Sequence, residues 1–255
     1  MNHEFLYLLG MLMICRLPML GDLPLSKPRW IIMSSLQVLF CLVLNITWAW
    51  LVFVIVLVAV NLLLFLRENA TREVIYGLRF STLLIFVVTL SVLFSPPINP
   101  GFNQSIIDPL KPLNDYVLIL AAFNDAGWLK INAILVGLLL VTTEINFFIR
   151  YVFSAFNLIP HITTTETDPG QSHAAVVDSQ EYNAGRFIGI LERILIFFFV
   201  LVSQYTAIAF IIAAKGFTRF KDLDEREFAE YVLIGTLLST STAVLAALLV
   251  KTIIS

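Results

Sequence analysis

The most constraining feature of this sequence is a long apolar region, Trp30–Leu66, that contains no charged residue. As a single α-helix its 37 residues would extend for about 55 Å, whereas the hydrocarbon core of a bilayer is roughly 30 Å thick. We therefore expect two membrane spans in this region, at about 30–46 and 49–66. We place the break near Asn45–Trp50, because polar side chains meet two tryptophans there and tryptophan favours the membrane interface.

The composition favours a membrane environment over a water-soluble fold. Hydrophobic residues make up 59% of the chain and charged residues 13%, against about 45–50% and about 25% in a soluble domain. Segments such as Leu51–Leu66 and Ile194–Val202 are apolar around the whole helix circumference, whereas a helix on the surface of a soluble protein has a polar face. The chain is therefore expected to form an all-α integral membrane helix bundle.

Four further apolar segments are long enough to cross a bilayer. They lie at about 74–94, 128–149, 187–214 and 228–250. The first of them ends at Ser95, because Pro96 and Pro97 cannot continue the hydrogen-bond ladder of a helix, and a Pro-rich loop follows. The expected total is about six transmembrane helices, within a range of five to seven.

The chain divides into three expected parts. Residues 1–29 form an N-terminal interfacial segment, because Phe5–Ile14 is apolar but is not preceded by the basic residues of a signal peptide. Residues 30–127 form an N-terminal membrane half. Residues 128–255 form a C-terminal membrane module that contains the polar linker 161–183.

Basic residues near the ends of the expected spans indicate the orientation in the membrane. Counted along six spans, one side carries Arg16, Lys27, Arg29, Arg67, Arg72, Arg79, Arg150, Arg186 and Lys251. The opposite side carries Lys111, Lys130, Lys215, Arg219, Lys221 and Arg226. The excess on the first side predicts a multi-pass protein with both termini in the cytoplasm.

Charged residues in two consecutive spans are the first candidate site. A charge at the centre of a bilayer costs roughly 2.5–3.5 kcal/mol on insertion scales, so it needs a partner or water. If spans four and five are antiparallel neighbours, Glu144 and Glu192 lie at matching depth and Arg193 lies beside them. We expect a Glu144/Arg193 pair and a contact of Glu192 with Arg150 or Arg186. Three roles stay open: anchors that reach the headgroups, a structural clamp, and a proton or ion relay.

The last span carries a strip of small side chains at four-residue spacing, which lets another helix approach closely. The strip consists of Gly235, Ser239, Ala243 and Ala247. Its partner is expected to be span five of the same chain, with the last span of a second copy as the alternative. Ser203 and Gln204, polar residues in the middle of span five, are the candidates for hydrogen bonds across this contact.

Signals for catalysis, metals and nucleic acids are weak or absent in the sequence. The chain has no Walker-type glycine loop, no HExxH and no Gly-x-Ser-x-Gly, so we expect neither enzymatic activity nor a cofactor. The three histidines are isolated, and Cys15 and Cys41 form no CxxC pair, so no metal site is expected. A net charge of −2 without a run of basic residues argues against nucleic-acid binding.

Four strings in the C-terminal half carry a resemblance to a known group. They are Thr143–Arg150, Gly185–Arg193, Ala214–Phe220 and Glu230–Ser239. Through them, residues from about 128 to 251 resemble a module of uncharacterised bacterial polytopic membrane proteins. Members of that group often begin with a His-x-x-x-Asp-Phe signature, which this chain lacks. The resemblance implies a bacterial cytoplasmic (inner) membrane and implies no reaction.

Two classes of function follow. In the first, the protein is a structural or interaction subunit in the lipid bilayer, which associates with a second copy or with another membrane protein. In the second, it is a small-solute or ion transporter or channel, with Glu144, Glu192, Arg193 and Gln204 along a polar path. Transport predicts discontinuous helices or an internal repeat, and the sequence shows neither, which favours the first class.

Overall fold

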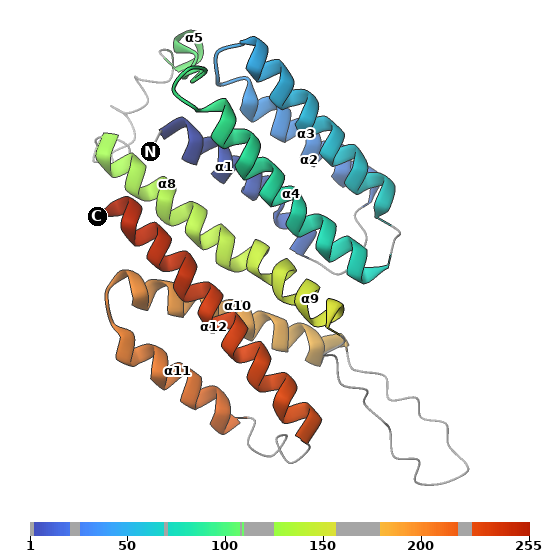
Figure 1. The fold of residues 1–255 in the computed structure, drawn as a ribbon, viewed down its shortest axis with the longest axis vertical. Coiled ribbons are helices and arrows are strands. Elements are labelled where there is room, and N and C mark those ends of the chain that lie inside the picture. Colours follow the sequence, from blue (N-terminus) through green and yellow to red (C-terminus); the bar gives the residue numbers. More distant parts are fainter. Residues whose placement is uncertain are drawn as a thin grey trace.

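The computed structural model shows an all-helical chain (Figure 1). It describes residues 3–20, 26–68, 71–107, 109, 125–156, 179–218 and 226–255. Within these residues the helices are joined by turns, and the β-type pairing is confined to one bridge between Leu44 and Phe102. Among the residues described, four helical stretches are long and apolar enough to cross a membrane: Trp48–Arg67, Val74–Leu93, Gly127–Ala155 and Ala229–Ile254.

The N-terminal half is a bundle of helices with alternating directions. α2 (Lys27–Cys41), α3 (Trp48–Arg67) and α4 (Arg72–Leu93) follow one another, and α3 and α4 occupy the second and third expected spans. Between α2 and α3, Asn61 Nδ2 donates a hydrogen bond of 2.6 Å to Gln37 Oε1, and both side chains are buried. This polar contact fixes the register of the two helices.

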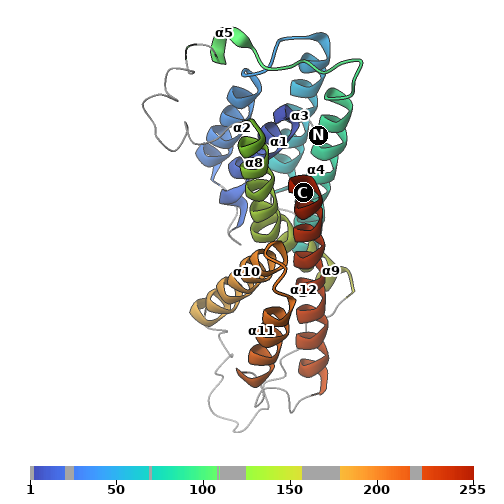
Figure 2. The same ribbon diagram turned by 90° about the vertical axis from the view of Figure 1, so that its left-hand side faces the viewer.

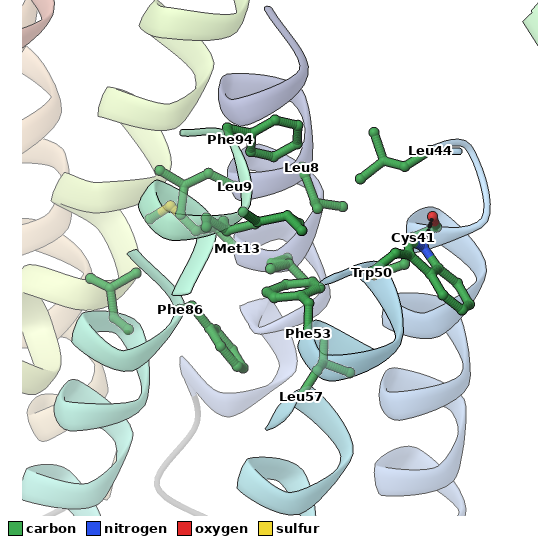
Figure 3. Close-up of a cluster of buried hydrophobic side chains, with 14 of the residues drawn as sticks. Leu8, Leu9, Met13, Cys41, Leu44, Trp50, Phe53, Leu57, Phe86 and Phe94 are labelled. Carbon is green, nitrogen blue, oxygen red and sulfur yellow. Dashed lines mark hydrogen bonds between the residues drawn. The ribbon is translucent and has the colours of Figure 1, made fainter. Parts of the chain in front are cut away.

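α1 (His3–Cys15) is an internal helix that packs against α2, α4 and α8 (Asp125–Leu139). Leu8 and Leu12 of α1 are fully buried, and Figure 3 shows Leu8 and Met13 among side chains of α3 and α4. This position corrects the expected interfacial segment. The cause is that α1 is only 13 residues long and almost wholly apolar, a pattern that a short buried helix shares with an interfacial one.

The turn between α2 and α3 lies at residues 42–47 and overlaps the predicted break at Asn45–Trp50, although α2 ends at Cys41, earlier than the first span was expected to end. α3 begins after its N-cap Thr47, whose Oγ1 accepts a hydrogen bond of 3.2 Å from Trp50 N. The backbone N–H of Asn45 donates to the carbonyl of Gly101 at 3.1 Å, which attaches this turn to the loop after α4. Gly101 has a φ of 64°, a conformation that favours glycine.

One long helix occupies the fourth expected span. α8 continues through a π-helical segment, η3 (Leu140–Glu144), into α9 (Ile145–Ala155). α12 (Arg226–Ile254) packs antiparallel to it, since the rings of Phe153 and Tyr231 lie 4.9 Å apart near one end and Gly137 faces Val250 near the other.

The expected fifth span, 187–214, is not a continuous helix. α10 (Ser179–Leu201) ends at Ser203, which adopts a φ of 61°. The backbone N–H of Gln204 donates to the carbonyl of Phe199 at 2.7 Å, and the backbone N–H of Ser203 donates to the carbonyl of Val200 at 3.0 Å. These two bonds form a Schellman motif, which satisfies the last carbonyls of a helix and stops it.

After this break, α11 (Tyr205–Thr218) runs back along the direction from which α10 came (Figure 2). α12 therefore starts at the end of the molecule where α10 starts, and it is antiparallel to α8 and α9 (Figure 1). Lys251 consequently lies at the opposite end from Arg150, which corrects their assignment to one side. The two ends of the chain lie close together in both views.

Other expected segments lie partly outside the described residues. Of the polar linker 161–183, residues 179–183 begin α10, and residues 161–178 are outside the described part. Of the Pro-rich loop after the third span, residues 110–124 are outside it as well.

Gly137 is expected to be intolerant of any side chain, because α8 meets α10 and α12 there. An added Cβ would lie 2.5 Å from Val250 Cγ2 and 2.6 Å from Phe197 Cζ. Gly137→Ala should lower the unfolding free energy by about 1–3 kcal/mol, measured by thermal unfolding in detergent. Gly216→Ala is the matched control, because its added Cβ meets no atom within 4 Å. An equal loss of stability in both variants would contradict the close approach of the helices.

Candidate functional site

The centre of the bundle contains an ion pair between Arg16 and Glu144. Arg16 follows the last residue of α1, and Glu144 is the last residue of η3. Arg16 Nε donates to Glu144 Oε1 at 2.7 Å, and Arg16 Nη2 donates to Glu144 Oε2 at 3.1 Å, so the contact is bidentate. The residues are 1% and 0% exposed. The pair therefore joins α1 to η3 in a region that is screened from solvent.

Two acceptors on α4 complete the surroundings of Arg16. Its Nη1 donates to Thr82 Oγ1, and its Nη2 donates to the carbonyl oxygen of Arg79. Thr82 lies ten residues after the start of α4 and eleven before its end, which is about 15 Å from either end by helical rise. The ion pair thus lies near the middle of the depth that α4 crosses.

A second buried arginine, Arg79, extends the network towards one end of the bundle. Arg79 Nη2 donates to Glu68 Oε1 at 2.9 Å, and Arg79 Nη1 donates to the carbonyl of Met19 at 2.9 Å. Its guanidinium also lies 5.6 Å from the centroid of the Phe147 ring, within the range of a cation–π contact. Arg79 thereby connects α4 to Met19, which precedes α2, and to Glu68, which follows α3.

Arg16 and Arg79 were absent from the site predicted from the sequence, where they served only to indicate orientation. For Arg79 a signal existed, because an arginine within an apolar span requires a partner. For Arg16 the sequence offered no such signal, since it follows a short apolar segment that did not look long enough to enter the bundle.

A third buried arginine, Arg193 of α10, binds η3 from a different helix. It is 4% exposed, and its Nε donates to the carbonyl of Val141 at 2.8 Å. Its Nη1 lies 3.4 Å from Ser239 Oγ on α12, and its Nη2 has no hydrogen-bond partner in the described part of the chain. Because the expected partner Glu144 is bound by Arg16, the predicted Glu144/Arg193 pair is wrong. π-Helical segments are frequent at functional sites, and here one such segment receives two arginines.

The predicted partner of Glu192 is also corrected. Glu192 Oε2 accepts a hydrogen bond of 2.5 Å from Lys215 Nζ, because α11 folds back along α10. Arg150 Nη1 instead donates to Tyr76 Oη at 2.7 Å, and its guanidinium lies 5.2 Å from the centroid of that ring. The side chain of Arg186 lies outside the described residues.

The predicted strip of small residues on α12 faces the interior of the same chain. Ala243 and Ala247 are fully buried and Ser239 is nearly so. A Cβ on Gly235 would lie 2.9 Å from Phe153 Cζ of α9. Since α12 packs against α8, α9 and α10, the strip allows α12 to approach all three helices closely.

Ser203 and Gln204 do not bind across this strip, contrary to the prediction. Both are exposed in the turn between α10 and α11. Ser203 Oγ accepts a hydrogen bond of 2.5 Å from Lys251 Nζ, which attaches the turn to the last part of α12.

Within the side chains that the structure describes, no three His, Cys, Asp or Glu residues lie close enough together to hold a metal ion. Cys15 and Cys41 are buried and free. The chain matches no protein-family model, no curated protein and no solved structure. The interpretation of the site therefore depends on its geometry.

Removing one partner of the Arg16/Glu144 pair is expected to be more harmful than removing both. Glu144→Gln leaves a buried guanidinium without its carboxylate, and Arg16→Gln leaves a buried carboxylate without its guanidinium. Each variant should therefore lower the unfolding free energy by about 3–5 kcal/mol. The double variant Arg16→Met, Glu144→Gln has no uncompensated charge and should recover part of this loss.

The measurement is folded yield together with thermal unfolding of the purified protein. Lys130→Gln, which changes an exposed charge on α8, serves as the control and should behave like the wild type. Single variants as stable as the wild type would show that the pair does not hold the bundle.

Proposed function

We propose that the protein is a non-enzymatic, polytopic membrane protein that acts as a structural or interaction subunit. The observation that carries this proposal is the Arg16/Glu144 pair, in which two charges at the centre of the bundle bind each other out of contact with solvent. A proton or ion path needs charges that meet water or exchange partners. A closed bidentate pair instead fixes the positions of helices, which is what a rigid frame for other components requires.

The proposed partners are the lipid bilayer and either a second copy or another membrane protein. α11 packs mainly against α10, and its Phe210 and Phe217 are among the most exposed aromatic side chains of the described chain. The resemblance of residues 128–251 to bacterial membrane proteins supports a location in the inner membrane. We place about six membrane-crossing segments in the chain, with α10 and α11 together forming a helical hairpin.

We propose that the end of the bundle that holds Arg67 and Arg150 faces the cytoplasm. The described helix ends on this side carry Lys27, Arg29, Arg67, Arg72, Arg150, Lys215 and Arg226. The opposite end carries Lys130 and Lys251. By the positive-inside rule this asymmetry is larger than the one counted along six spans. It reverses the expected orientation of both chain ends, because α1 runs inside the bundle from the opposite end and α11 folds back along α10.

Cysteine labelling tests this orientation. In a background with Cys15→Ala and Cys41→Ala, single cysteines replace Ser105 or Ser255 at one end and Ser26 at the other, all of which are exposed. A membrane-impermeant maleimide applied to spheroplasts should label positions 105 and 255 and leave position 26 unlabelled until the cells are lysed. The opposite labelling pattern would contradict the proposed orientation.

The mass and the permeability of the purified protein test the subunit proposal. One chain has a mass of 28.7 kDa, so light scattering corrected for detergent distinguishes a single copy from several. We expect either a multiple of this mass or a membrane protein that stays bound through extraction into lipid nanodiscs. Liposomes that contain the protein should show no more solute or ion flux than empty liposomes. A solitary chain that raises flux would contradict the proposal.

A small-solute or ion transporter is the second candidate function, and the discontinuities of the helices favour it. α1 ends in mid-bundle at Arg16, and Ser203 separates α10 from α11. Transporters often build their binding sites from such broken helices. The proposed polar path is closed at Glu144 by Arg16 and at Glu192 by Lys215, which is why we rank this function second.

A further inference from the structure

One of the buried arginines, Arg193, forms no hydrogen bond to a carboxylate among the described residues. Arg16 binds Glu144 and Arg79 binds Glu68, so each of these two guanidinium groups has a carboxylate partner. Within the described part of the chain, Arg193 contacts a carbonyl and a hydroxyl oxygen, and no carboxylate binds it. Glu192 lies near enough to act electrostatically on Arg193, but its Oε2 accepts a hydrogen bond from Lys215 Nζ, and Arg193 Nη2 is left without an acceptor within the ranges described. A buried donor without an acceptor is costly, so the missing acceptor calls for a source.

The Arg193 guanidinium is anchored along one edge and has an unsatisfied donor along the other. On the anchored edge, Nε donates to the Val141 carbonyl at 2.8 Å. On the other edge, Nη1 reaches Ser239 Oγ at 3.4 Å, which is the limit of a hydrogen bond, and Nη2 has no partner among the described residues. Ser239 is 9% exposed, and no described residue accepts its hydroxyl proton. Three donors, Nη1, Nη2 and Ser239 Oγ, thus lie close together, and the described residues supply too few acceptors for them.

We propose that Arg193 and Ser239 form a binding subsite for a small oxyanion, a carboxylate or a phosphate. The planar fork of a guanidinium matches two oxygens of such a group, and the Ser239 hydroxyl supplies a further donor. The bound oxyanion provides the hydrogen-bond acceptor that the described chain does not place beside Arg193 Nη2. This inference goes beyond the subunit function and does not depend on it.

The depth of the site bears on the source of the oxyanion. Ser239 lies 13 residues after the start of α12 and 15 before its end, which is about 20 Å from either end by helical rise. A phosphate of a lipid in its ordinary position lies near the membrane surface, whereas a small dissolved anion can reach mid-depth. Because Nη2 is enclosed by the surrounding helices, we expect the anion to exchange slowly.

The test measures thermal unfolding of the purified protein in micelles of dodecyl maltoside, an uncharged detergent that contains no phosphate. In the first arm, the micelles are incubated overnight with sodium phosphate or sodium acetate, and chloride keeps the ionic strength constant. In the second arm, phosphatidylglycerol is added to the micelles, without added phosphate or acetate. The Tm of the wild type should rise by about 3 °C at tenfold the half-saturating concentration of the anion.

Arg193→Gln should abolish this rise, whereas Lys130→Gln, an exposed cation on α8, should retain it. Should Arg193→Gln not fold, Ser239→Ala provides the second variant, because alanine already occupies two other positions of the strip. It should raise the half-saturating concentration by about tenfold.

A response to free phosphate or acetate supports the subsite and assigns it to a dissolved anion, and a response to phosphatidylglycerol alone supports it and assigns it to a lipid phosphate. An unchanged Tm of the wild type in both arms overturns the proposal, as does an equal rise in Arg193→Gln.

Discussion

A charge buried at bilayer depth has no water to stabilise it, so it needs a partner within the protein. The bidentate contact between Arg16 and Glu144 provides this partner, and the helices are arranged around it. The apolar contacts of α1, such as those of Leu8 and Met13, have no preferred direction and would tolerate small rotations or translations. The hydrogen bonds of a guanidinium do not tolerate such movements, because its donors have a fixed planar geometry. Arg16 thus sets the depth and the rotation of α1 relative to α4 and η3.

The π-helical segment is the place where the two halves of the chain are joined. The extra residue in its turn changes the register between α8 and α9, so Glu144 meets α1 while the Val141 carbonyl meets α10. Two arginines from opposite parts of the sequence therefore bind one five-residue segment. A displacement of α10 at Arg193 acts directly on the backbone that carries the partner of Arg16.

The long apolar runs made α3, α4 and α12 easy to predict, because an uninterrupted run of about 20 apolar residues matches the thickness of a bilayer. The end of α10 was beyond such reasoning. Ser203 and Gln204 were noticed as polar side chains, but the break depends on a left-handed φ at a residue other than glycine, which apolar flanking residues do not reveal. The charged residues of the second half were found because a charge in a span needs a partner. Their partners were mistaken because Lys215 reaches Glu192 only through the reversal of α11, and because Arg16 lies in a helix too short for hydropathy to place inside the bundle.

The sequence separation of the central pair has a consequence for biosynthesis. Arg16 and Glu144 are 128 residues apart, and a ribosome adds about 5–20 residues per second, so the glutamate is made about 6–25 s after the arginine. Throughout that interval the nascent α1 carries a charge that its final depth does not yet accommodate. α1 therefore leaves the ribosome well before its place in the bundle is complete, and until then it must be held at the lipid surface or by the insertion machinery.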